Sequence, residues 1–462
     1  MHEFDAIIIG VGQAGNPLCS KLTEQGLSVA IVEKEHAGGS CINYGCTPTK
    51  AMLASAHVAS VVQKSKEWGI TTKSSKVNFK KVLKRRDNIV KNWRKGIKTR
   101  IEENSQAKFI KGEAQFVSSD TIDIISGKDK GTQLKAPKIF INVGTQPTIP
   151  TIAGLDSINY YTAKTIMKLA ERPKHLIILG GSYIGLEYAQ MYRQLGSKVT
   201  VIHDKPQLAP REDEDIALKL HELLLNEGCQ LFLKAETKEA VKHKQGFKLK
   251  VEVSGKGEQW LKGSHLLLAT GTTPNTQSLN LEAAGIKTNE EGYIEVNTKL
   301  ATSVEGIWAL GDCKGGPEFT HISYNDYCIV EDQLFGDQKL TTRNRMVPYT
   351  LYTQPELGRI GLSEKEAKEE GLEFKVAKIA AEEVGRTELE GHTFGILKVI
   401  VDATNNRILG GACLIDRGGE MAAMLQIAMM GKLTYQQLRD GIFAHPGYAE
   451  AWNTLFMKLD ED

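Results

Sequence analysis

The chain has 462 residues, of which 41% are hydrophobic and 25% are charged, and its formal net charge is +2. This length allows two to four domains, and the near-neutral charge argues against nucleic acid or a membrane as a general partner. Its seven cysteines are too few and too scattered for a secreted disulfide scaffold, and no apolar run approaches membrane-spanning length. Because no signal peptide is evident, we expect a reducing, cytoplasmic location.

A glycine-rich turn near the N-terminus has the surroundings of a nucleotide site. Residues 4–9 form a short apolar run, which predicts a buried parallel strand, and Gly10-Val-Gly12-Gln-Ala-Gly15 follows directly. A helix to about residue 25 and a second strand over 28–32 come next, and that strand ends at Glu33. The glycine pattern alone is weak evidence. Between a strand and a helix, with an acid about twenty residues further on, it indicates a dinucleotide.

Each of these residues has a physical reason to be there. Gly10 permits the tight turn, Gly12 lets a pyrophosphate approach the backbone, and Gly15 lets the helix and strand pack closely. The diphosphate would then bind the free N–H groups at the start of the helix. Glu33 is expected to hydrogen-bond a ribose hydroxyl pair.

Two cysteines follow in the segment Gly-Gly-Ser-Cys-Ile-Asn-Tyr-Gly-Cys-Thr-Pro-Thr-Lys, residues 38–50. Cys41 and Cys46 are close enough to share an electron pair, so they form a candidate redox dithiol. Two ordinary small buried residues are the alternative, since free cysteine often only fills a core. The preceding fingerprint, together with Pro48 and Lys50 after the pair, favours the dithiol. A helix beginning near Pro48 would offer its positive end to a thiolate.

A basic stretch runs from Lys73 to Lys111 and predicts a long amphipathic helix with a solvated cationic face. The apolar side chains expected to point towards the protein are Val82, Ile89, Val90, Trp93 and Ile97.

The nucleotide pattern then recurs. A strand over 175–179 leads into Gly180-Gly181-Ser182-Tyr183-Ile184-Gly185, a helix to residue 195 and a strand over 198–202. Ser182 replaces the middle glycine, which crowds a pyrophosphate slightly, although its hydroxyl can donate to a phosphate. Two fingerprints predict two dinucleotides. One domain would bind a flavin and the other a nicotinamide, because hydride transfer needs a donor and an acceptor.

Three further strand-and-turn segments fit the same scheme. The runs 140–143 and 266–269 each end in a Gly/Pro turn, at Gly144 and Gly271, as expected of strands that close nucleotide-binding units. The run 307–310 leads to Gly311 and Asp312.

Residues 38–50 resemble the redox-active motif of the class I pyridine nucleotide–disulfide oxidoreductases, which include dihydrolipoamide dehydrogenase, glutathione reductase and mercuric reductase. The resemblance covers essentially the whole chain, and 319–327 and 347–358 look most similar to the mercuric-reductase-like branch. It implies an α/β fold with two Rossmann-like domains and a C-terminal α+β dimerisation domain. The implied domains are an FAD domain with the dithiol (1–152), an NAD(P) domain (153–275), a central domain completing the FAD site (276–345) and a dimerisation domain (346–462).

The resemblance also implies roles at the dithiol. Cys46 would be the thiol nearest the flavin, and Cys41 the interchange thiol that attacks substrate. Lys50 falls where the family keeps a lysine beside the flavin, paired to a glutamate at the position of Glu187. The alternative is a surface lysine and a helix-surface glutamate.

Near the C-terminus, His445-Pro-Gly-Tyr-Ala-Glu450 resembles the family's proton-accepting motif, in which a glutamate orients the histidine. Imidazole suits this task because its pKa lies near working pH. In the family this segment reaches the other subunit's dithiol, which implies a homodimer with shared active sites.

The cofactor contacts implied in this way form two sets. The FAD set is Gly10, Gly12, Gly15, Glu33, Gly39, Ser40, Lys50, Ala114, Gly144 and Asp312; the nicotinamide set is Gly180, Ser182, Tyr183, Gly185, His203, Lys205 and Gly271. Tyr183 either covers the flavin until nicotinamide displaces it or is simply a packed aromatic. His203 and Lys205 at the end of the second strand favour NADPH slightly, whereas Asp204 opposes a 2′-phosphate. We expect no resident metal ion.

The acceptor is the least constrained feature. The chain ends without the vicinal cysteines that load metal in mercuric reductases, so efficient mercuric turnover is not expected. A small disulfide or a thiol-reactive metal ion is the favoured acceptor. A lipoamide dehydrogenase is the alternative, although Asn43-Tyr44 and Phe443 depart from its motifs. A third hypothesis is a flavin-bearing scaffold with a vestigial dithiol.

Overall fold

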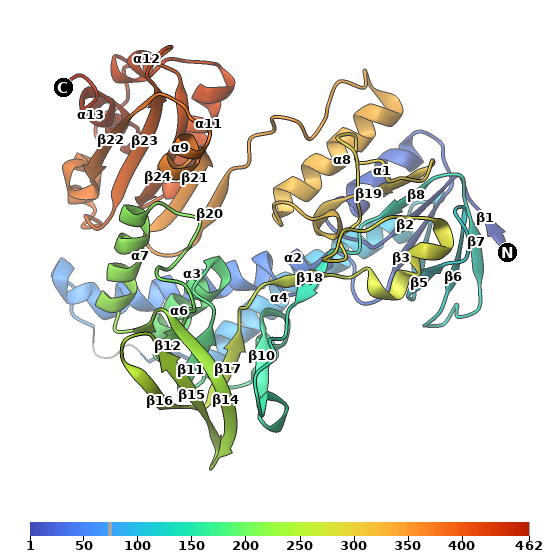
Figure 1. The fold of residues 1–462 in the computed structure, drawn as a ribbon, viewed down its shortest axis with the longest axis horizontal. Coiled ribbons are helices and arrows are strands. Elements are labelled where there is room, and N and C mark those ends of the chain that lie inside the picture. Colours follow the sequence, from blue (N-terminus) through green and yellow to red (C-terminus); the bar gives the residue numbers. More distant parts are fainter. Residues whose placement is uncertain (73–75, 462) are drawn as a thin grey trace.

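The computed structural model describes residues 1–72 and 76–461, and three five-stranded sheets organise the chain. In Figure 1 the first sheet lies at the right, the second at the lower left and the third at the upper left. The first two are parallel and the third is antiparallel, so the predicted α/β class with a C-terminal α+β unit is confirmed. Within the described ranges, no helix is long and apolar enough to cross a membrane.

The first sheet has the strand order β19-β8-β2-β3-β4. Every residue of β2 and β3 is buried, which explains their nearly continuous Ile, Val and Ala. Each large aliphatic side chain buried in this way contributes roughly 1.5–3 kcal/mol to the free energy of unfolding. The strands are β2 (Ala6–Ile9), β3 (Val29–Glu33), β4 (Ala107–Lys111), β8 (Ile139–Ile141) and β19 (Ile307–Ala309). A smaller sheet flanks them, with β1 (His2–Glu3), β7 (Gln133–Lys135), β6 (Thr121–Ile124) and β5 (Ala114–Phe116).

The second sheet repeats this design with the order β10-β17-β11-β12-β13. Its strands are β10 (Tyr160–Thr162), β11 (His175–Leu179), β12 (Lys198–Ile202), β13 (Gln230–Phe232) and β17 (His265–Leu268). A three-stranded antiparallel sheet covers one side, made by β14 (Ala235–His243), β15 (Gly246–Val253) and β16 (Gly257–Gly263). Between the two parallel sheets, β9 (Thr145–Pro147) pairs with β18 (Thr272–Pro274). This pair joins the turns that follow β8 and β17.

The third sheet has the order β20-β21-β24-β23-β22. Its strands are β20 (Tyr349–Leu351), β21 (Glu356–Gly361), β22 (Phe374–Ala380), β23 (Ile396–Asp402) and β24 (Ile408–Ile415). The helices α11 (Gly418–Met430) and α13 (Ala451–Met457) pack on it and share its core. The short helices of this region are α9 (Glu364–Glu369), α10 (Gly385–Leu389) and α12 (Tyr435–Arg439).

The remaining helices connect and cover the parallel sheets. They are α1 (Gly15–Glu24), α2 (Gly39–Asn43), α3 (Cys46–Lys64), α4 (Phe79–Glu102), α5 (Ala163–Ile166), α6 (Tyr183–Gln194), α7 (Glu214–Asn226) and α8 (Thr320–Phe335). Side chains of α3 and α4 share one hydrophobic core with α6 and the second sheet. The redox segment, which spans α2 and the start of α3, is therefore held between the two nucleotide-binding sheets.

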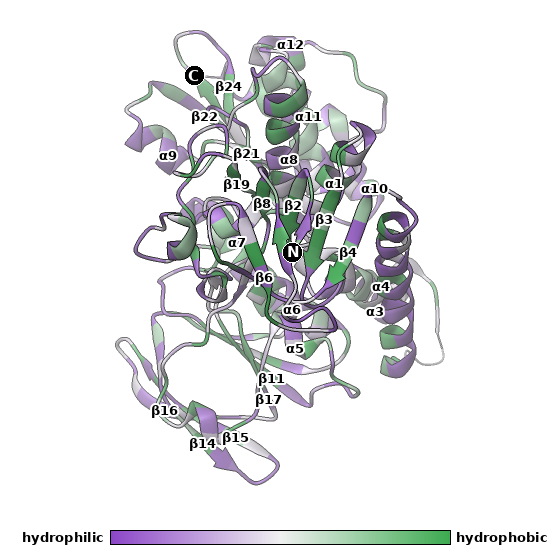
Figure 2. Cartoon of the chain, turned by 90° about the vertical axis from the view of Figure 1, so that its right-hand side faces the viewer, coloured by the Kyte–Doolittle hydropathy of each residue, from purple (hydrophilic) through white to green (hydrophobic). Residues whose placement is uncertain are grey.

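The basic stretch departs from its predicted orientation. A helix is present, but its predicted inward residue Trp93 is 56% exposed, whereas Arg86 is 5% exposed. Figure 2 shows α4 as a largely hydrophilic helix at the edge of the molecule. Lys108 and Lys111 belong to β4, and Lys73 lies outside the described residues. The prediction about Trp93 was wrong because α4 packs mainly against α3. Only a narrow stripe of the α4 surface is buried in that contact, and Trp93 lies outside it.

Three arginines of α4 support the redox segment. Arg94 Nε donates to Asn43 Oδ1 at 2.7 Å, and Arg85 donates to the Ala51 carbonyl at 2.7 Å. Arg86 lies against the sulfur atoms of two methionines and pairs with Asp87. Part of the charge that the sequence places on a solvated face therefore fixes α2 and α3 in position.

Candidate active site

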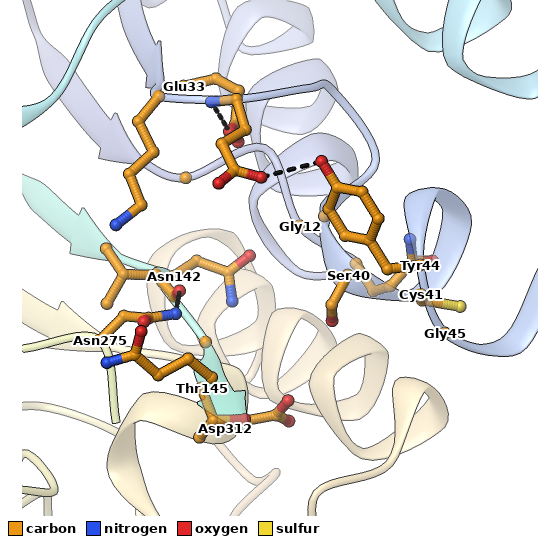
Figure 3. Close-up of a pocket in the computed structure, with 18 of the residues that line it drawn as sticks. Gly12, Glu33, Ser40, Cys41, Tyr44, Gly45, Asn142, Thr145, Asn275 and Asp312 are labelled. Atoms are coloured by element: carbon orange, nitrogen blue, oxygen red, sulfur yellow. Dashed lines mark hydrogen bonds between the residues drawn. The ribbon is translucent and has the colours of Figure 1, made fainter. Parts of the chain in front are cut away.

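One elongated cavity runs along the carboxyl edge of the first parallel sheet and ends at the dithiol. Figure 3 shows Gly12 and Glu33 on one wall, Ser40, Cys41 and Tyr44 on a second, and Asn142 and Asp312 on a third. These walls come from the β2–α1 turn and the end of β3, from the redox segment, and from the turns after β8 and β19. The predicted FAD residues that line the cavity are Gly10, Gly12, Glu33, Gly39, Ser40, Ala114, Gly144 and Asp312.

The β2–α1 turn leaves no room for side chains. Gly10 has φ +102°, and a Cβ there would lie 2.2 Å from the Asn142 carbonyl oxygen. A Cβ on Gly12 would lie 2.5 Å from Asn142 Oδ1, and one on Gly15 would lie 2.3 Å from the Gly10 carbonyl oxygen. Gly12 lines the cavity whereas Gly15 lies behind it, against the strand. A bare backbone facing a cavity at a helix N-terminus fits a diphosphate.

Glu33 is in place for a ribose. Its side chain is buried and accepts hydrogen bonds from Val11 N at 3.0 Å and from Glu35 N at 2.6 Å. At the other end of the cavity, burial and the nearby Glu318 carboxylate raise the pKa of Asp312 to about 7. A side chain that titrates near neutrality can accept or donate a hydrogen bond, which suits a polyhydroxyl chain. These residues fit the two ends of a flavin dinucleotide.

The two thiols are chemically unequal. Cys41 lies in α2, Cys46 is the first residue of α3, and both are free. A hydrogen bond from Cys41, a contact with Thr320 Oγ1 at 3.4 Å and the Lys50 charge lower the pKa of Cys46 to about 6. The same hydrogen bond and burial raise the pKa of Cys41. At neutral pH the reduced pair therefore holds a thiolate on Cys46 and a thiol on Cys41.

Lys50 and Glu187 form the predicted pair. Lys50 Nζ lies 3.0 and 2.9 Å from the two carboxylate oxygens, and Glu187 also accepts from Tyr352 N at 3.0 Å. Burial disfavours the lysine charge, but Glu187 outweighs it and raises the pKa of Lys50. The pair joins α3 to α6 and keeps a permanent positive charge beside Cys46.

The C-terminal motif is assembled but lies apart from the cavity of its own chain. His445 Nδ1 is 3.0 Å from Glu450 Oε1, and Gly447 N donates to Glu450 Oε2 at 2.8 Å. The Gly447 and His445 hydrogen bonds lower the pKa of Glu450. The His445 side chain is 81% exposed and is not among the residues that line the cavity. An oriented imidazole that faces outward is suited to serve a site on another molecule.

The second fingerprint repeats the geometry of the first with different surroundings. Gly180 has φ +116°, and its Cβ would lie 2.1 Å from the Ala269 carbonyl oxygen. A Cβ on Gly185 would lie 2.1 Å from the Gly180 carbonyl oxygen, and Ser182 is the N-cap of α6. Gly271 has φ +99° in the turn after β17. These residues form a second bare turn at a helix N-terminus.

His203 is placed differently from the expected exposed phosphate ligand. It is 8% exposed, its ring carbons lie 2.8 Å from a Cβ built on Gly181, and its Nε2 has no hydrogen-bond partner in the described ranges. Burial lowers the pKa of His203, so the ring is neutral at pH 7. Lys205 is exposed and pairs with Asp204 at 3.0 Å. Of these three side chains, Lys205 and Asp204 reach the surface, whereas His203 does not.

Comparison with known proteins decides the family. The pyridine nucleotide-disulphide oxidoreductase family matches residues 4–326, and its dimerisation domain matches residues 347–456. The chain belongs to this family. The predicted membership of the class I flavoprotein disulfide oxidoreductases is confirmed, and FAD and a nicotinamide nucleotide are the cofactors that this membership implies.

Several relatives match the chain over nearly its whole length. The probable pyridine nucleotide-disulfide oxidoreductase RclA of Escherichia coli (strain K12) is 35% identical over 99% of both chains. The mercuric reductase of Staphylococcus aureus is 29% identical and covers 100% of this chain and 83% of its own. A solved structure, the Cu(II) complex of HOCl-induced flavoprotein disulfide reductase RclA from Escherichia coli, superposes with a TM-score of 0.90 at 34% identity, over 99% of both chains.

Sequence reasoning missed several residues of the site. Thr320 contacts Cys46, and Asn142 bridges the turn by accepting from Gly15 N at 3.0 Å and donating to the Leu310 carbonyl at 2.8 Å. Tyr44, which also lines the cavity, donates to Glu35 at 2.8 Å. The sequence carried a signal for Asn142, because a polar side chain at the end of a buried strand needs hydrogen-bond partners. Thr320 had none, since its contact spans 274 residues.

Proposed function

We propose that the protein is an NAD(P)H-dependent flavoprotein disulfide reductase whose acceptor is a thiol-reactive metal ion or a small disulfide. The observation that carries the proposal is the asymmetric Cys41–Cys46 pair at the end of a dinucleotide cavity. Bound FAD would pass an electron pair from the reduced nicotinamide to the Cys41–Cys46 disulfide. The residues of the chain then have to stabilise the Cys46 thiolate, pass the electrons to the acceptor and transfer the Cys41 proton.

With a small disulfide, the electrons leave by two exchanges. Cys41 Sγ loses its proton to His445 of a second chain, attacks one substrate sulfur and releases the other as a thiolate. Cys46 Sγ then attacks Cys41 Sγ, which re-forms the Cys41–Cys46 bond and releases the second substrate thiolate. The proton held on His445 protonates the leaving thiolate. The exposed and oriented His445 supports this role, which requires a homodimer; the dimerisation domain supports the same conclusion.

A metal-ion acceptor uses the same pair as soft ligands. Oxidising the dithiol to a disulfide releases two electrons and the Cys41 proton; the electrons reduce two Cu(II) ions to Cu(I), and His445 of a second chain takes the proton. Thiolates are strong ligands for copper, so the reduced pair would hold the incoming ions, and Cu(I) would be released as the disulfide forms. The Cu(II) complex of the similar Escherichia coli reductase makes copper the first metal to test. Cys46 is exposed in the single chain, so an ion can reach it.

The decisive experiment supplies candidate acceptors to one preparation. NADPH or NADH is mixed anaerobically with the yellow protein and then with Cu(II), Hg(II), glutathione disulfide or lipoamide. Cys41→Ser should reduce turnover of the true acceptor to background yet keep the long-wavelength thiolate–flavin band, and Cys46→Ser should lose that band. Wild-type turnover in both variants would rule out the dithiol mechanism.

Lipoamide dehydrogenase remains the second candidate because the dihydrolipoyl dehydrogenase of Pisum sativum is 29% identical over 97% of this chain. In that case lipoamide would be the best acceptor by a wide margin, with NADH as its nucleotide partner. The departures at Tyr44 and Phe443 favour the first proposal.

A further inference from the structure

A buried carboxylate ties the second fingerprint to the third sheet. Glu212 lies in the connection between β12 and α7 and is 4% exposed. Its Oε1 accepts hydrogen bonds from Tyr183 Oη and from Tyr349 Oη, both at 2.8 Å. Its Oε2 lies 3.0 Å from Nε of Arg359, which is 3% exposed. Burial raises the pKa of the Glu212 carboxyl, and Arg359 and the two tyrosine hydrogen bonds act against that shift, so the buried group depends on these three partners.

The two tyrosines contribute the hydrogen bonds of this cluster. Arg359 Nε and Glu212 Oε2 are close, but neither makes an aligned hydrogen bond in the described structure. The arginine therefore acts as a countercharge, and the hydroxyl groups are the donors. A hydrogen bond to a charged group contributes more than one between neutral groups. The Tyr183 hydroxyl is thus held firmly in one position.

That position lies between the nicotinamide turn and the dithiol. Tyr183 is the first residue of α6, directly after the second fingerprint, and its neighbour Ile184 lines the cavity. The Tyr183 ring meets the Tyr349 ring edge-on at 5.3 Å, and Tyr349 stacks on Phe319 at 5.6 Å. Phe319 precedes Thr320, which touches Cys46. Tyr183 therefore lies between the second fingerprint and the dithiol end of the cavity, on the side from which a nicotinamide bound at that fingerprint would enter.

We propose that Glu212 is a positioning residue that holds Tyr183 in a closed position and thereby sets how readily the nicotinamide ring enters the cavity. The inference rests on the proposed function, because it assigns Tyr183 to the path of hydride. Turning the ring aside breaks the Tyr183–Glu212 hydrogen bond. When a ligand binds only an open state, its apparent affinity falls in proportion to the population of that state. Glu212 therefore lowers nucleotide affinity and keeps the cavity closed between turnovers.

A purely structural cluster would behave differently. Tyr183 and Tyr349 donate to the same oxygen with the same length, so a cluster that only joins domains would respond equally to loss of either hydroxyl. If Glu212 instead acts as a latch that holds Tyr183 closed, NADPH affinity should respond only to loss of the hydroxyl on the moving Tyr183 ring. Tyr349→Phe is therefore a matched control for Tyr183→Phe.

The test measures NADPH binding and flavin reduction in the holoenzyme by anaerobic rapid mixing. Tyr183→Phe should bind NADPH with an apparent Kd about tenfold lower than wild type, as expected when one charge-assisted hydrogen bond of roughly 1.4 kcal/mol no longer opposes opening. Tyr349→Phe should stay within about twofold. Equal changes in the two variants, or a higher Kd in Tyr183→Phe, would overturn the latch.

A double-mutant cycle locates the effect at Glu212. Glu212→Gln should also lower the Kd, and Tyr183→Phe/Glu212→Gln should bind no more tightly than the stronger single variant. Additive effects would show that the residues act separately and would overturn the proposal. If Glu212→Gln does not fold because Arg359 is left unpaired, the contrast between the two tyrosine variants decides alone. If wild-type flavin is not reduced, the proposed function fails, and calorimetric NADPH binding still tests the latch.

Discussion

The two glycine-rich turns have nearly the same backbone geometry, but the side chains around them differ. Gly10 and Gly180 have φ values of +102° and +116°, and a Cβ on either would strike the carbonyl oxygen of a neighbouring strand end at 2.2 and 2.1 Å. The last glycine of each pattern packs against the first in the same way, at 2.3 and 2.1 Å. Helix and strand can approach this closely only where side chains are absent. The shared backbone is therefore a condition of the fold.

The residues around the turns differ in what they can hold. The first turn faces an elongated cavity closed by Asn142 and by Glu33, whose carboxylate accepts two backbone N–H groups. The second has Ser182 in place of the middle glycine and the buried His203 ring under Gly181. The first arrangement suits a cofactor that stays bound for many turnovers, whereas the second suits a nucleotide that exchanges. We therefore expect the neighbouring side chains, rather than the turns themselves, to distinguish a prosthetic group from a cosubstrate.

Substituting the middle residue of each glycine-rich turn should have the largest effect and should show that the two turns bind different nucleotides. A Cβ at Gly12 would lie 2.5 Å from Asn142 Oδ1, so Gly12→Val should exclude the diphosphate and give colourless protein without turnover. Ser182→Val should keep one FAD per chain and raise the KM for NADPH about tenfold, a cost of roughly 1.4 kcal/mol. Flavin absorbance per chain and steady-state rates measure both. Full flavin content in Gly12→Val would contradict the assignment of the first turn.

A residue outside both turns should separate the two half-reactions. His445→Ala should slow acceptor reduction by about 10²–10⁴, the usual contribution of a positioned general base, because Cys41 then has no proton acceptor. Rapid mixing with NADPH alone should show nearly unchanged flavin reduction. Equal slowing of both steps would indicate a structural role for His445.

Mixed dimers test whether His445 acts across subunits. Chains with Cys41→Ser and chains with His445→Ala are each expected to be inactive as homodimers. A heterodimer of the two would contain one site with both residues intact and should recover about half of the wild-type rate per dimer. No recovery would show that His445 serves its own chain.

Much of the fold was predictable because the decisive patterns are local. The strands predicted over 175–179 and 198–202 coincide with β11 and β12, where an apolar run meets a glycine turn or polar residues. The run from residue 4 forms a strand only from Ala6, because the Asp5 carboxylate binds Ser28 N and Oγ at 2.8 and 2.7 Å. Such a side-chain contact across 23 residues leaves no trace in hydrophobic periodicity.

The parts of the site that were missed depend on packing between distant segments. Periodicity indicated an amphipathic α4, but which stripe faces inward depends on α3, so Trp93 and Arg86 were assigned to the wrong sides. His203 was predicted from its position at a strand end, yet its ring turns under Gly181 because that residue has no side chain. The Glu212 cluster joins residues 29 and 137 positions apart in sequence.

The Lys50 charge beside the dithiol predicts a pH-dependent effect of moderate size on the Cys46 thiolate. Because the pKa of Cys46 is lowered to about 6, its thiolate should dominate at pH 7 and disappear as the pH falls through about 6. The long-wavelength band of the anaerobically reduced protein should follow the same titration. Lys50→Met removes a charge that favours the thiolate and should move the midpoint upward. Lys84→Met, on the exposed face of α4, should leave it unchanged. An unchanged midpoint in Lys50→Met would mean that Lys50 does not stabilise the thiolate.

The smallest expected effect concerns the choice of nicotinamide. Glu33 accepts a hydrogen bond from Val11 N in the first turn. A carboxylate at the corresponding place in the second turn would bind a ribose diol and repel a 2′-phosphate. That place holds His203, which is neutral and buried, while the exposed Lys205 and Asp204 nearly cancel. Wild type should therefore prefer NADPH by less than about tenfold in kcat/KM, since an exposed ion pair contributes only about 0–1 kcal/mol.

Exchange of this one residue should reverse the preference. His203→Glu places a carboxylate where it can accept Gly181 N, and the ratio of kcat/KM values should move towards NADH by about tenfold, or roughly 1.4 kcal/mol. Lys205→Met is the matched control and should weaken NADPH use only a few-fold, because Lys205 is exposed and already paired with Asp204. A wild-type advantage of tenfold or more for NADH would mean that Asp204 binds the ribose and that His203 only fills the space under Gly181.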